Sequence, residues 1–372
     1  MRVLHVISDE NIGGAGVLLL NLLRHFDRNA VESAVAMPRG SMLRERVLAL
    51  RVPVVELETP CDRVSLRSVG ELAGAIRKTN AEIVHANAAV SARVAGRLCG
   101  RTVVYTRHCC FPAEANANRP LPIRAVRGMA NRFFCDRAVA TAEAAAEDLR
   151  RDGIRDREIA VILNGSEPVR PVSEEEKTLW RVRLGIQPSD FCIGICARLE
   201  PCKGHDVFLR AARLATHAMP EFPFRFLLIG DGSRRLELER LAAEAGLGRR
   251  VIFTGFQPDV APFYRLLRVH VNCSVGTETS CLAVSEGMSA GLPTVLSDFG
   301  GNRAMLGHSG AGYCLPAGNA PALAEAFCRL ALRPELAHAM GENARRRYEQ
   351  KYTAAGMANR MAAVYRELCG QK

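Results

Sequence analysis

The sequence of 372 residues contains no unbroken apolar run of the roughly 18 residues that a transmembrane helix needs. It also lacks the features of a signal peptide at its start, because Arg2–Ser8 has the composition of a buried strand. We therefore expect a cytoplasmic protein, with peripheral association at the inner face of the cell membrane left open. A chain of this length suits two ordinary domains better than one.

The cysteines lack the spacing of a zinc site or a disulfide framework. There are 13 of them, an odd number, and none forms a Cys-x-x-Cys pair. We interpret them as reduced, mostly buried thiols that pack as small apolar residues. No Asp-x-Asp motif follows a predicted strand, so we expect neither an essential metal ion nor another cofactor.

Short apolar segments alternate with helical patterns along the first part of the chain. Candidate strands include Val3–Ser8, Ile83–Ala86 and Val103–Arg107. This alternation predicts a parallel sheet that helices cover on both faces. A polar segment with two prolines follows Asn164, and the alternation then restarts at Phe191.

The break in the pattern predicts two Rossmann-like, doubly wound α/β domains that face each other across a cleft. We expect the first domain over 1–165, a linker over 166–188 and the second domain over 189–350. Residues 351–372 are expected to form a C-terminal helix that packs back on the first domain. Ligands of such sheets bind at the carboxyl ends of the strands, so the chemistry should lie on the loops there.

Positive charge is concentrated in one part of the chain. The net charge is +11, and the segment 93–137 holds nine arginines against Glu114 and Asp136. Such a segment suits an anionic membrane surface or an acidic glycan, and an ordinary solvated face explains it equally well. We expect no nucleic-acid partner.

Two cations follow the strand predicted over Phe191–Ala197. Arg198 comes directly after it, and Lys203 stands where the next helix is predicted to begin. Cationic side chains beside the free amides of a helix N-terminus favour the binding of a diphosphate. Taken alone, the two residues are more simply explained as solvated surface charges.

Two glutamates stand eight residues apart farther along the chain. Glu278 is predicted in the loop after strand Val269–Asn272, and Glu286 about one turn into the following helix, among apolar neighbours. A carboxylate there needs polar partners, and a ribose would supply two hydroxyl donors. The free amides of Leu282 and Ala283 at the helix start suit a phosphate. A capping or ion-pair role for the carboxylates is the alternative.

The Glu-x7-Glu pattern from Glu278 to Glu286, together with Arg198 and the Lys203-Gly204 pair, resembles the family 4 glycosyltransferases. These are retaining enzymes with the GT-B fold. The resemblance implies a hexosyltransferase that moves a sugar from a nucleoside-diphosphate sugar, UDP-linked by default. Its acceptor would be a lipid-linked glycan or a polysaccharide in cell-surface glycan synthesis.

Further motifs extend the resemblance over nearly the whole chain. The segment Gly13-Gly14-Ala15-Gly16 resembles the glycine loop of the family, and His108 resembles its active-site histidine. Asn164-Gly165 resembles the pair that closes the first domain. Gly230 and Phe256 lie in stretches that resemble the lining of the nucleotide-base pocket. The chain departs from the family at Thr279-Ser280-Cys281, where many members have Gly-Phe-Pro or Gly-Phe-Gly.

The resemblance implies a role for each of these residues. Arg198 and Lys203 would hold the diphosphate and offset its charge as the sugar bond breaks. Glu286 would accept from the ribose hydroxyls, and Glu278 and His108 would contact the transferred sugar. The amides of Gly14 and Ala15, next to Gly13, would approach the distal phosphate. The leaving phosphate would take the acceptor's proton, and a covalent intermediate on Glu278 is the less favoured course.

Other functions fit less of the sequence. Half of a dinucleotide fingerprint is present at Gly14-x-Gly16, but position 19 is leucine and no acidic residue ends the second strand. A catalytically silent GT-B partner subunit and a nucleotide-sugar isomerase remain as alternatives. His85, inside an apolar strand, is more simply a core histidine with satisfied hydrogen bonds than a ligand.

Overall fold

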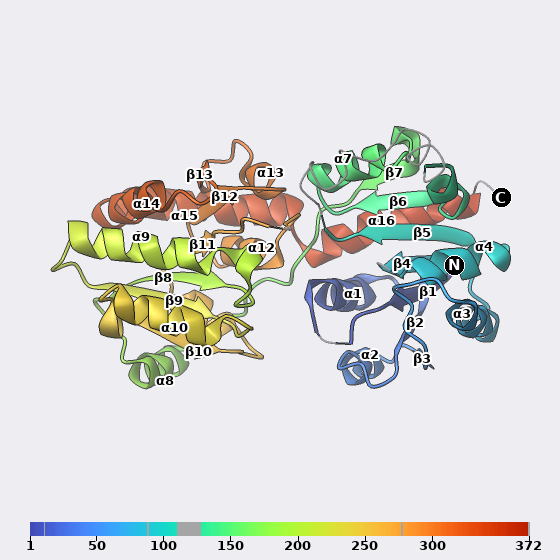
Figure 1. Ribbon diagram of the computed structural model, residues 1–372, viewed down its shortest axis with the longest axis horizontal. Helices are drawn as coiled ribbons and strands as arrows, with labels where there is room; N and C mark the ends of the chain where they lie inside the picture. The colour runs from blue at the N-terminus through green and yellow to red at the C-terminus, as the bar shows by residue number, and fades with distance from the viewer. Residues whose placement is uncertain (11, 88, 110–127, 277, 371–372) are drawn as a thin grey trace. The chain divides into compact units, whose positions relative to one another are not determined.

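The computed structural model describes residues 1–370 apart from 11, 88, 110–127 and 277. The chain divides into two compact units (Figure 1). Unit 1 comprises Met1–Ser166 and Tyr352–Lys372, and unit 2 comprises Glu167–Lys351. Each unit is one parallel sheet with helices on its two faces, so the prediction of two doubly wound α/β domains is confirmed.

The sheet of unit 1 has seven strands in the order β3-β2-β1-β4-β5-β6-β7, and every neighbouring pair is parallel. The strands are β1 (Arg2–Ile7), β2 (Glu32–Pro38), β3 (Val54–Leu57), β4 (Ile83–Asn87), β5 (Thr102–Arg107), β6 (Arg137–Ala140) and β7 (Ile159–Val161). The described helices of this unit are α1 (Gly14–His25), α2 (Arg44–Ala49), α3 (Leu66–Lys78), α4 (Val90–Leu98), α7 (Glu143–Arg151) and α16 (Ala354–Gly370). Strand β1 is buried from Val3 to Ile7, as expected for a strand that helices cover on both faces.

The sheet of unit 2 has six parallel strands in the order β10-β9-β8-β11-β12-β13. The strands are β8 (Phe191–Cys196), β9 (Phe224–Ile229), β10 (Val251–Gly255), β11 (Val269–Asn272), β12 (Thr294–Asp298) and β13 (Gly312–Pro316). The helices are α8 (Glu174–Leu184), α9 (His205–Ala218), α10 (Arg235–Glu244), α11 (Ala261–Leu266), α12 (Leu282–Ser289), α13 (Asn302–Leu306), α14 (Ala320–Leu332) and α15 (Pro334–Lys351). Short 3-10 turns are η1 (Asp156–Glu158) in unit 1, and η2 (Pro201–Lys203) and η3 (Gly248–Arg250) in unit 2.

Unit 2 has a separate core on each face of its sheet. One core gathers around Phe208, Phe226 and Phe327 beneath α9, α10 and α14. The other gathers around Phe263 and Tyr264 beneath α8 and α11. The two apolar layers fix the sheet between them, and the loops at its carboxyl edge are held in place as a result.

A close approach of two backbones marks the end of the first stretch of unit 1. A Cβ atom added at Gly165 would lie 2.4 Å from the carbonyl oxygen of Thr353, so only glycine fits there. Ser166 forms a β-bridge with Thr353, and the Nδ2 of Asn21 on α1 donates to the carbonyl oxygen of Gly165 at 3.0 Å. Helix α16, the last helix of the chain, packs on α1 within this unit.

The segment predicted as a linker contains helix α8. The Ser173 side chain accepts from the amide of Glu176 and caps the helix, three glutamates occupy its first turn, and Gly185 ends it at φ 64°. Trp180 packs against Phe263 of α11 with ring centroids 4.7 Å apart. Residues 174–184 are therefore an ordered part of unit 2, and the prediction of a linker is wrong for them.

Most of the described arginines between 93 and 137 make contacts inside unit 1. Arg97 pairs with Asp136 at 2.9 Å, Arg107 with Asp152 at 2.5 Å, and Arg137 with Glu367 at 2.6 Å. Arg93 and Arg132 donate to backbone carbonyl oxygens. Arg119, Arg124 and Arg127 lie outside the described residues. The described part of this segment therefore uses much of its positive charge to hold the unit together.

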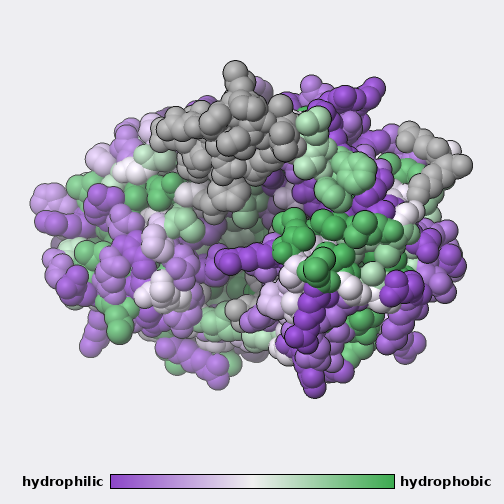
Figure 2. Space-filling view, turned by 45° about the vertical axis from the view of Figure 1, so that its right-hand side comes forward, coloured by the Kyte–Doolittle hydropathy of each residue, from purple (hydrophilic) through white to green (hydrophobic). Residues whose placement is uncertain are grey.

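Hydrophilic residues predominate on the face drawn in Figure 2, with hydrophobic residues in smaller groups between them. Among the described residues, no helix is both long and apolar enough to cross a membrane. The cysteines that the structure describes are all free thiols, and several are buried.

Several histidines are buried, and they lie in both units. His85 donates or accepts at both ring nitrogens, 2.5 Å from the Tyr365 hydroxyl and 2.6 Å from Thr106 Oγ1, which confirms its interpretation as a core residue. Burial lowers the pKa of His5 and of His270 to about 3, and that of His205 to about 4. These side chains are therefore neutral in the folded protein.

We expect the free energy of unfolding to fall as the pH drops from about 6.5 to 5. In this window the unfolded chain gains protons on these histidines, whose unfolded pKa is about 6.5, whereas the folded chain does not. Each such histidine contributes a slope of roughly 1.4 kcal/mol per pH unit once the pH lies below its unfolded pKa. Urea unfolding at several pH values measures this slope. Replacing one of them, His5→Phe, should reduce it by about one proton, and an unchanged slope would contradict the assignment.

Candidate functional site

The loops after β8 and β9 are in direct contact at the carboxyl edge of the unit 2 sheet. Gly230 has φ 137°, and a Cβ atom added to it would lie 2.2 Å from the carbonyl oxygen of Ala197. The amide of Leu199 donates to the carbonyl oxygen of Asp231 at 2.9 Å. Arg198 stands between these contacts, two residues after the end of β8, and its side chain is exposed. The backbone beneath it is thus fixed, whereas its guanidinium faces solvent.

The backbone at Gly204 packs tightly against Cys273, the residue after β11. Gly204 has φ 67°, and a Cβ atom there would lie 2.1 Å from the carbonyl oxygen of Cys273. This approach brings the loop that carries Lys203 beside the loop that carries Glu278. The Nζ of Lys203 lies 2.8 Å from Oε2 of Glu278, with side chains only 17% and 7% exposed.

Glu278 is an ionised carboxylate that several polar side chains contact. Ser274 Oγ donates to its Oε2 at 2.7 Å, and Asn272 Nδ2 lies 3.4 Å from the same atom. Burial would raise the pKa of Glu278, but the charge of Lys203 and these hydrogen bonds outweigh it and hold the pKa below its ordinary value. The loop after β11 therefore carries a negative charge whose counter-ion comes from the loop after β8.

Glu286 has the opposite electrostatic character. It lies on α12, half-buried, and its Oε2 accepts from the Tyr264 hydroxyl at 3.0 Å. Burial raises the pKa of Glu286 to about 7, although the hydrogen bond from Tyr264 works against the rise. Tyr264 lies on α11, and its hydroxyl is also 3.0 Å from the carbonyl oxygen of Ala283. Among the described residues, no basic side chain forms an ion pair with Glu286.

Cys281 lies between the two glutamates in the sequence and contacts Asn272, which also contacts Glu278. It is the N-cap residue of α12 and makes no side-chain capping bond, and Asn272 Nδ2 lies 3.3 Å from its sulfur. Burial tends to lower the pKa of Lys203, and its interactions with Cys281 and Glu278 raise it more. Lys203, Glu278 and the start of the helix that bears Glu286 are therefore neighbours. The amides of Leu282 and Ala283 open that helix.

Lys203, Glu278, Ser274 and Asn272 form a polar cluster at this edge of the sheet. Arg198 and Phe256 lie at the same edge, but neither side chain belongs to this cluster. Arg198 forms no salt bridge with a described residue. Phe256 follows β10, and its side chain is 67% exposed. Arg198, Gly230, Phe256 and the Glu278 loop follow β8, β9, β10 and β11 in turn, so the structure places these predicted residues at the carboxyl ends of neighbouring strands.

The remaining predicted residues belong to unit 1. Helix α1 begins at Gly14, and Gly13 is its N-cap without a side-chain capping bond. A Cβ atom added at Gly14 would meet nothing within 4 Å, whereas one added at Gly16 would lie 2.9 Å from the Leu43 side chain. The amides of Gly14 and Ala15 thus open the first turn of α1. Packing against Leu43 explains the glycine at position 16.

His108 follows β5 and is neutral. Its Nε2 lies 3.2 Å from Oδ1 of Asn87, the last residue of β4. Burial lowers its pKa to about 4. The imidazole can therefore exchange hydrogen bonds with a polar ligand at neutral pH, but it does not supply a positive charge.

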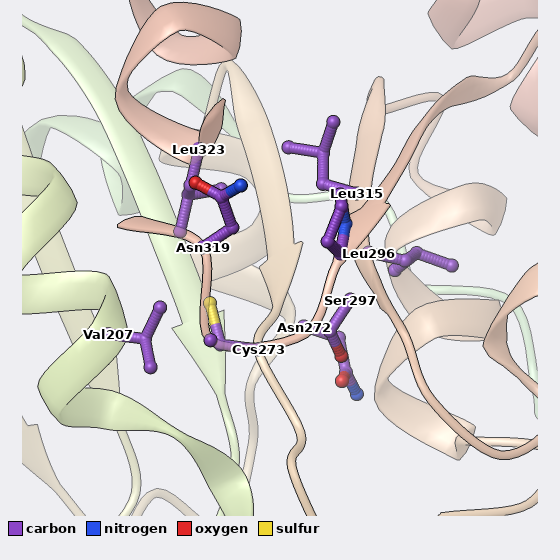
Figure 3. Close-up of a pocket in the computed structure, with 10 residues that line it drawn as sticks. Val207, Asn272, Cys273, Leu296, Ser297, Leu315, Asn319 and Leu323 are labelled. Carbon is purple, nitrogen blue, oxygen red and sulfur yellow. The ribbon is translucent and has the colours of Figure 1, made fainter. Parts of the chain in front are cut away.

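A small apolar pocket lies beside the polar cluster, at the ends of β11, β12 and β13 (Figure 3). Val207 of α9 and Leu323 of α14 approach it from one side, and Cys273 lies between them and Asn272. None of the described residues predicted for the donor site lines this pocket. Its apolar lining is a poor match for a diphosphate.

Sequence reasoning missed Asn272, Ser274 and Tyr264. Asn272 ends β11 and Ser274 follows it, so their place after a strand was a usable signal for both. Tyr264 gave no signal, because its contact with Glu286 depends on how α11 packs beside α12. Among the described residues, no group of three or more His, Cys, Asp or Glu side chains is placed to hold a metal ion.

The chain resembles known proteins over both units. A model described as Glycosyltransferase Family 4 matches residues 12–170, and one described as Glycosyl transferases group 1 matches residues 176–347. A D-inositol 3-phosphate glycosyltransferase of Acidothermus cellulolyticus is 32% identical over 235 residues, which are 56% of this chain and 50% of that protein. The lipopolysaccharide core biosynthesis mannosyltransferase LpcC of Rhizobium leguminosarum is 29% identical over 190 residues, or 49% and 53% of the two chains.

Most of these matches to curated relatives span about half of those proteins' length. Among solved structures, Anabaena HepE in complex with UDP-glucose superposes with a TM-score of 0.84 at 21% identity, covering 99% of this chain and 100% of that one. At that identity the likeness shows the GT-B fold. Because the two family models together match most of the sequence in the expected order, the chain belongs to the family 4 type of glycosyltransferases with the GT-B fold.

Proposed function

We propose that the protein is a retaining hexosyltransferase that moves a sugar from a nucleoside-diphosphate sugar to a lipid-linked or polysaccharide acceptor. The observation that carries this proposal is the cluster at the carboxyl edge of the unit 2 sheet. There, Lys203 pairs with Glu278 beside the start of α12, and Glu286 projects from that helix without a cationic partner among the described residues. The neighbour solved with UDP-glucose supports a UDP-linked donor.

Each residue of the cluster has a role in this proposal. The exposed guanidinium of Arg198 and the remaining N–H groups of Lys203 bind the diphosphate, with the amides of Leu282 and Ala283. Glu286 accepts from the two ribose hydroxyls, and Gly230 and Phe256 line the base. Glu278 contacts hydroxyls of the sugar. In unit 1, His108 and the amides of Gly14 and Ala15 act on the sugar and the distal phosphate.

Charge on the leaving group is the main electrostatic task of the reaction. The bond between the anomeric carbon and the diphosphate oxygen breaks, and the negative charge that develops falls on a group held by Arg198 and Lys203. The acceptor hydroxyl attacks on the same face, and its proton passes to the departing phosphate oxygen. Glu278 already bonds to Lys203 and Ser274, which lowers its nucleophilicity and favours this course over a covalent intermediate. No metal ion is needed in this scheme.

Two measurements test the proposal. A thermal-shift panel of nucleoside diphosphates and nucleotide sugars should show a higher melting temperature with the correct donor, because a ligand of the native state stabilises it. Proton NMR of the first product formed should show the anomeric configuration of the donor. A product of inverted configuration would contradict the retaining mechanism, and an unshifted melting temperature with every nucleotide would contradict the donor site.

Turnover separates the proposal from its alternatives. A glycosyltransferase consumes the nucleotide sugar much faster with an acceptor than without one. An isomerase would convert it without any acceptor, and a silent partner subunit would bind it without turnover. The joint presence of Arg198, Lys203, Glu278 and Glu286 at one sheet edge favours the transferase.

We further propose a cytoplasmic location with peripheral contact to an anionic membrane through the segment 93–137. Among its described residues, Phe133 and Met129 are exposed next to Arg97 and Arg132, a mixture suited to a membrane surface. Sedimentation with vesicles should show binding to acidic and not to neutral lipid. Equal binding to both, or binding to neither, would reject this contact.

We expect Tyr264→Phe to weaken binding of the nucleoside diphosphate about fivefold at pH 7. The variant keeps the ring in its packed position and removes the hydroxyl that orients Glu286 and opposes the rise of its pKa, a contribution of about 1 kcal/mol. Because the carboxyl then ionises at higher pH, the defect should shrink at pH 8.5. Calorimetric titration of UDP at both pH values measures this, and a defect that does not depend on pH would argue against an orienting role.

A further inference from the structure

A second polar pocket lies at the opposite edge of the unit 2 sheet, which we term the amino-edge pocket. It is lined by Glu174, Lys177 and Arg181 on one stripe of α8, by Asp190 and Cys192 at the start of β8, and by Arg265 and Arg268 before β11. The cavity has a volume of about 230 Å³. Since β8 is six residues long, this pocket lies roughly 20 Å from the predicted donor site at the other end of that strand.

The acidic side chains of the amino-edge pocket are already paired. Oε1 of Glu174 lies 2.5 Å from Nζ of Lys177, one turn away on α8. Oδ2 of Asp190 lies 2.8 Å from Nε of Arg225 and also accepts from the amide of Gln187 at 2.8 Å. Neither carboxylate is left to neutralise the other cations of the pocket.

Three guanidinium groups remain without a carboxylate partner among the described residues. Arg181 and Arg268 appear in no ion pair, and Arg268 is exposed. Arg265 donates to the carbonyl oxygens of Val169 and Arg170, which hold its position but do not cancel its charge. Burial lowers the pKa of Arg265, and the charge of Arg345, which does not line the pocket, lowers it further.

Cys192 lines the amino-edge pocket and lies near the guanidinium groups of Arg181 and Arg268. Cys192 is buried, and burial together with the charge of Asp190 raises the pKa of its thiol. The charges of Arg268, Arg225 and Arg181 act in the opposite direction. Guanidinium groups from α8 and from the segment before β11 therefore surround the same point.

We propose that the amino-edge pocket binds a small phosphorylated anion, at a site separate from the predicted donor site. Guanidinium groups match phosphate oxygens with paired hydrogen bonds, and two of them approaching from different elements suit a ligand with two anionic groups. The strongly polar lining favours a ligand that is charged over most of its surface, and the cavity volume of about 230 Å³ suits a small anion. A bound anion would link α8 to the strands of the sheet and so stabilise unit 2.

The test uses inorganic pyrophosphate as the probe and the full-length chain at low ionic strength, where such contacts are least screened. Arg181→Gln combined with Arg268→Gln removes two of the three guanidinium groups that have no carboxylate partner among the described residues. The matched control is Arg183→Gln combined with Arg240→Gln, which removes the same charge from exposed positions on α8 and α10. Circular dichroism and the melting temperature without ligand establish that both double variants fold.

Calorimetric titration should show at least about a tenfold loss of pyrophosphate affinity at this site in R181Q/R268Q and little change in R183Q/R240Q. Because pyrophosphate is also expected to enter the donor site, the titrations are repeated with Lys203→Gln, after circular dichroism has shown that this variant folds without the counter-ion of Glu278. This variant should leave the amino-edge event in place. Equal affinity in the two double variants would overturn the proposal, as would loss of all binding in Lys203→Gln alone. These outcomes do not depend on whether the chain transfers a sugar.

Discussion

Lys203→Ala is expected to lower both the stability of the protein and its use of the donor. The substitution leaves Glu278 with its hydrogen bonds from Ser274 and Asn272 but without its counter-ion, in a place where the side chain is only 7% exposed. Breaking a buried ion pair from one side costs about 3 kcal/mol or more. In the proposed mechanism the same change removes a cation from the leaving diphosphate, which we expect to lower kcat about 100-fold.

A double variant separates these two effects. Lys203→Ala with Glu278→Gln removes both charges, so no uncompensated carboxylate remains, and the free energy of unfolding should recover most of the loss. The turnover number should not recover, because the diphosphate still lacks its cation. Urea unfolding and steady-state kinetics on the wild type, both single variants and the double variant complete the cycle. Donor turnover that recovers with stability would show that Lys203 acts only as a structural ion-pair partner.

The architecture could be predicted from the sequence, because parallel strands that are buried on both faces consist mostly of apolar residues. β1, β4 and β8 all show this pattern, and the break near Asn164 marks the end of the first stretch of unit 1. Helix α8 was not predicted. None of its residues is fully buried, so apolar residues do not recur along it at helical spacing. Its capping serine and its acidic first turn were present in the sequence, but those signals are easily taken for a polar linker.

Only part of the candidate site could be predicted from the sequence. That Arg198, Lys203 and Glu278 follow strands could be predicted, because strand ends are visible in the pattern. That Lys203 pairs with Glu278 could not, because it depends on Gly204 fitting against the carbonyl oxygen of Cys273. The raised pKa of Glu286 likewise comes from packing between α11 and α12. Sequence order identifies the elements that meet at a sheet edge, and tertiary contacts decide which of their side chains bond.

Glu286→Gln is expected to abolish the protein's ability to recognise a ribose, and to make the folded state more stable. Burial holds the pKa of the carboxyl near 7, well above its ordinary value of about 4.5, so the folded state resists its ionisation. This group therefore contributes stability that is fully present below pH 4.5 and is lost as the pH rises through 7. The neutral amide avoids that loss, and we expect a gain of about 1–3 kcal/mol in unfolding free energy at pH 8.

Binding should change in the opposite direction, because two ribose hydroxyls donate best to an ionised carboxylate. We expect the affinity of the wild type for UDP to fall as the pH drops below 7, by up to about tenfold per pH unit from Glu286 alone. In Glu286→Gln that dependence should disappear, apart from the protonation of the diphosphate itself, and affinity at pH 8 should be at least about 30-fold lower than in the wild type. Calorimetry from pH 6 to 8.5 measures both curves.

Comparison of UDP with 2′-deoxy-UDP assigns the loss to the ribose. The wild type should prefer UDP by about tenfold, because the deoxy ligand leaves one carboxylate oxygen without a donor, whereas Glu286→Gln should distinguish the two ligands only weakly. If the variant kept the full preference, the carboxylate would not be the group that reads the 2′-hydroxyl. A side chain that weakens the fold and strengthens binding is expected at a site where function, and not packing, decides the residue.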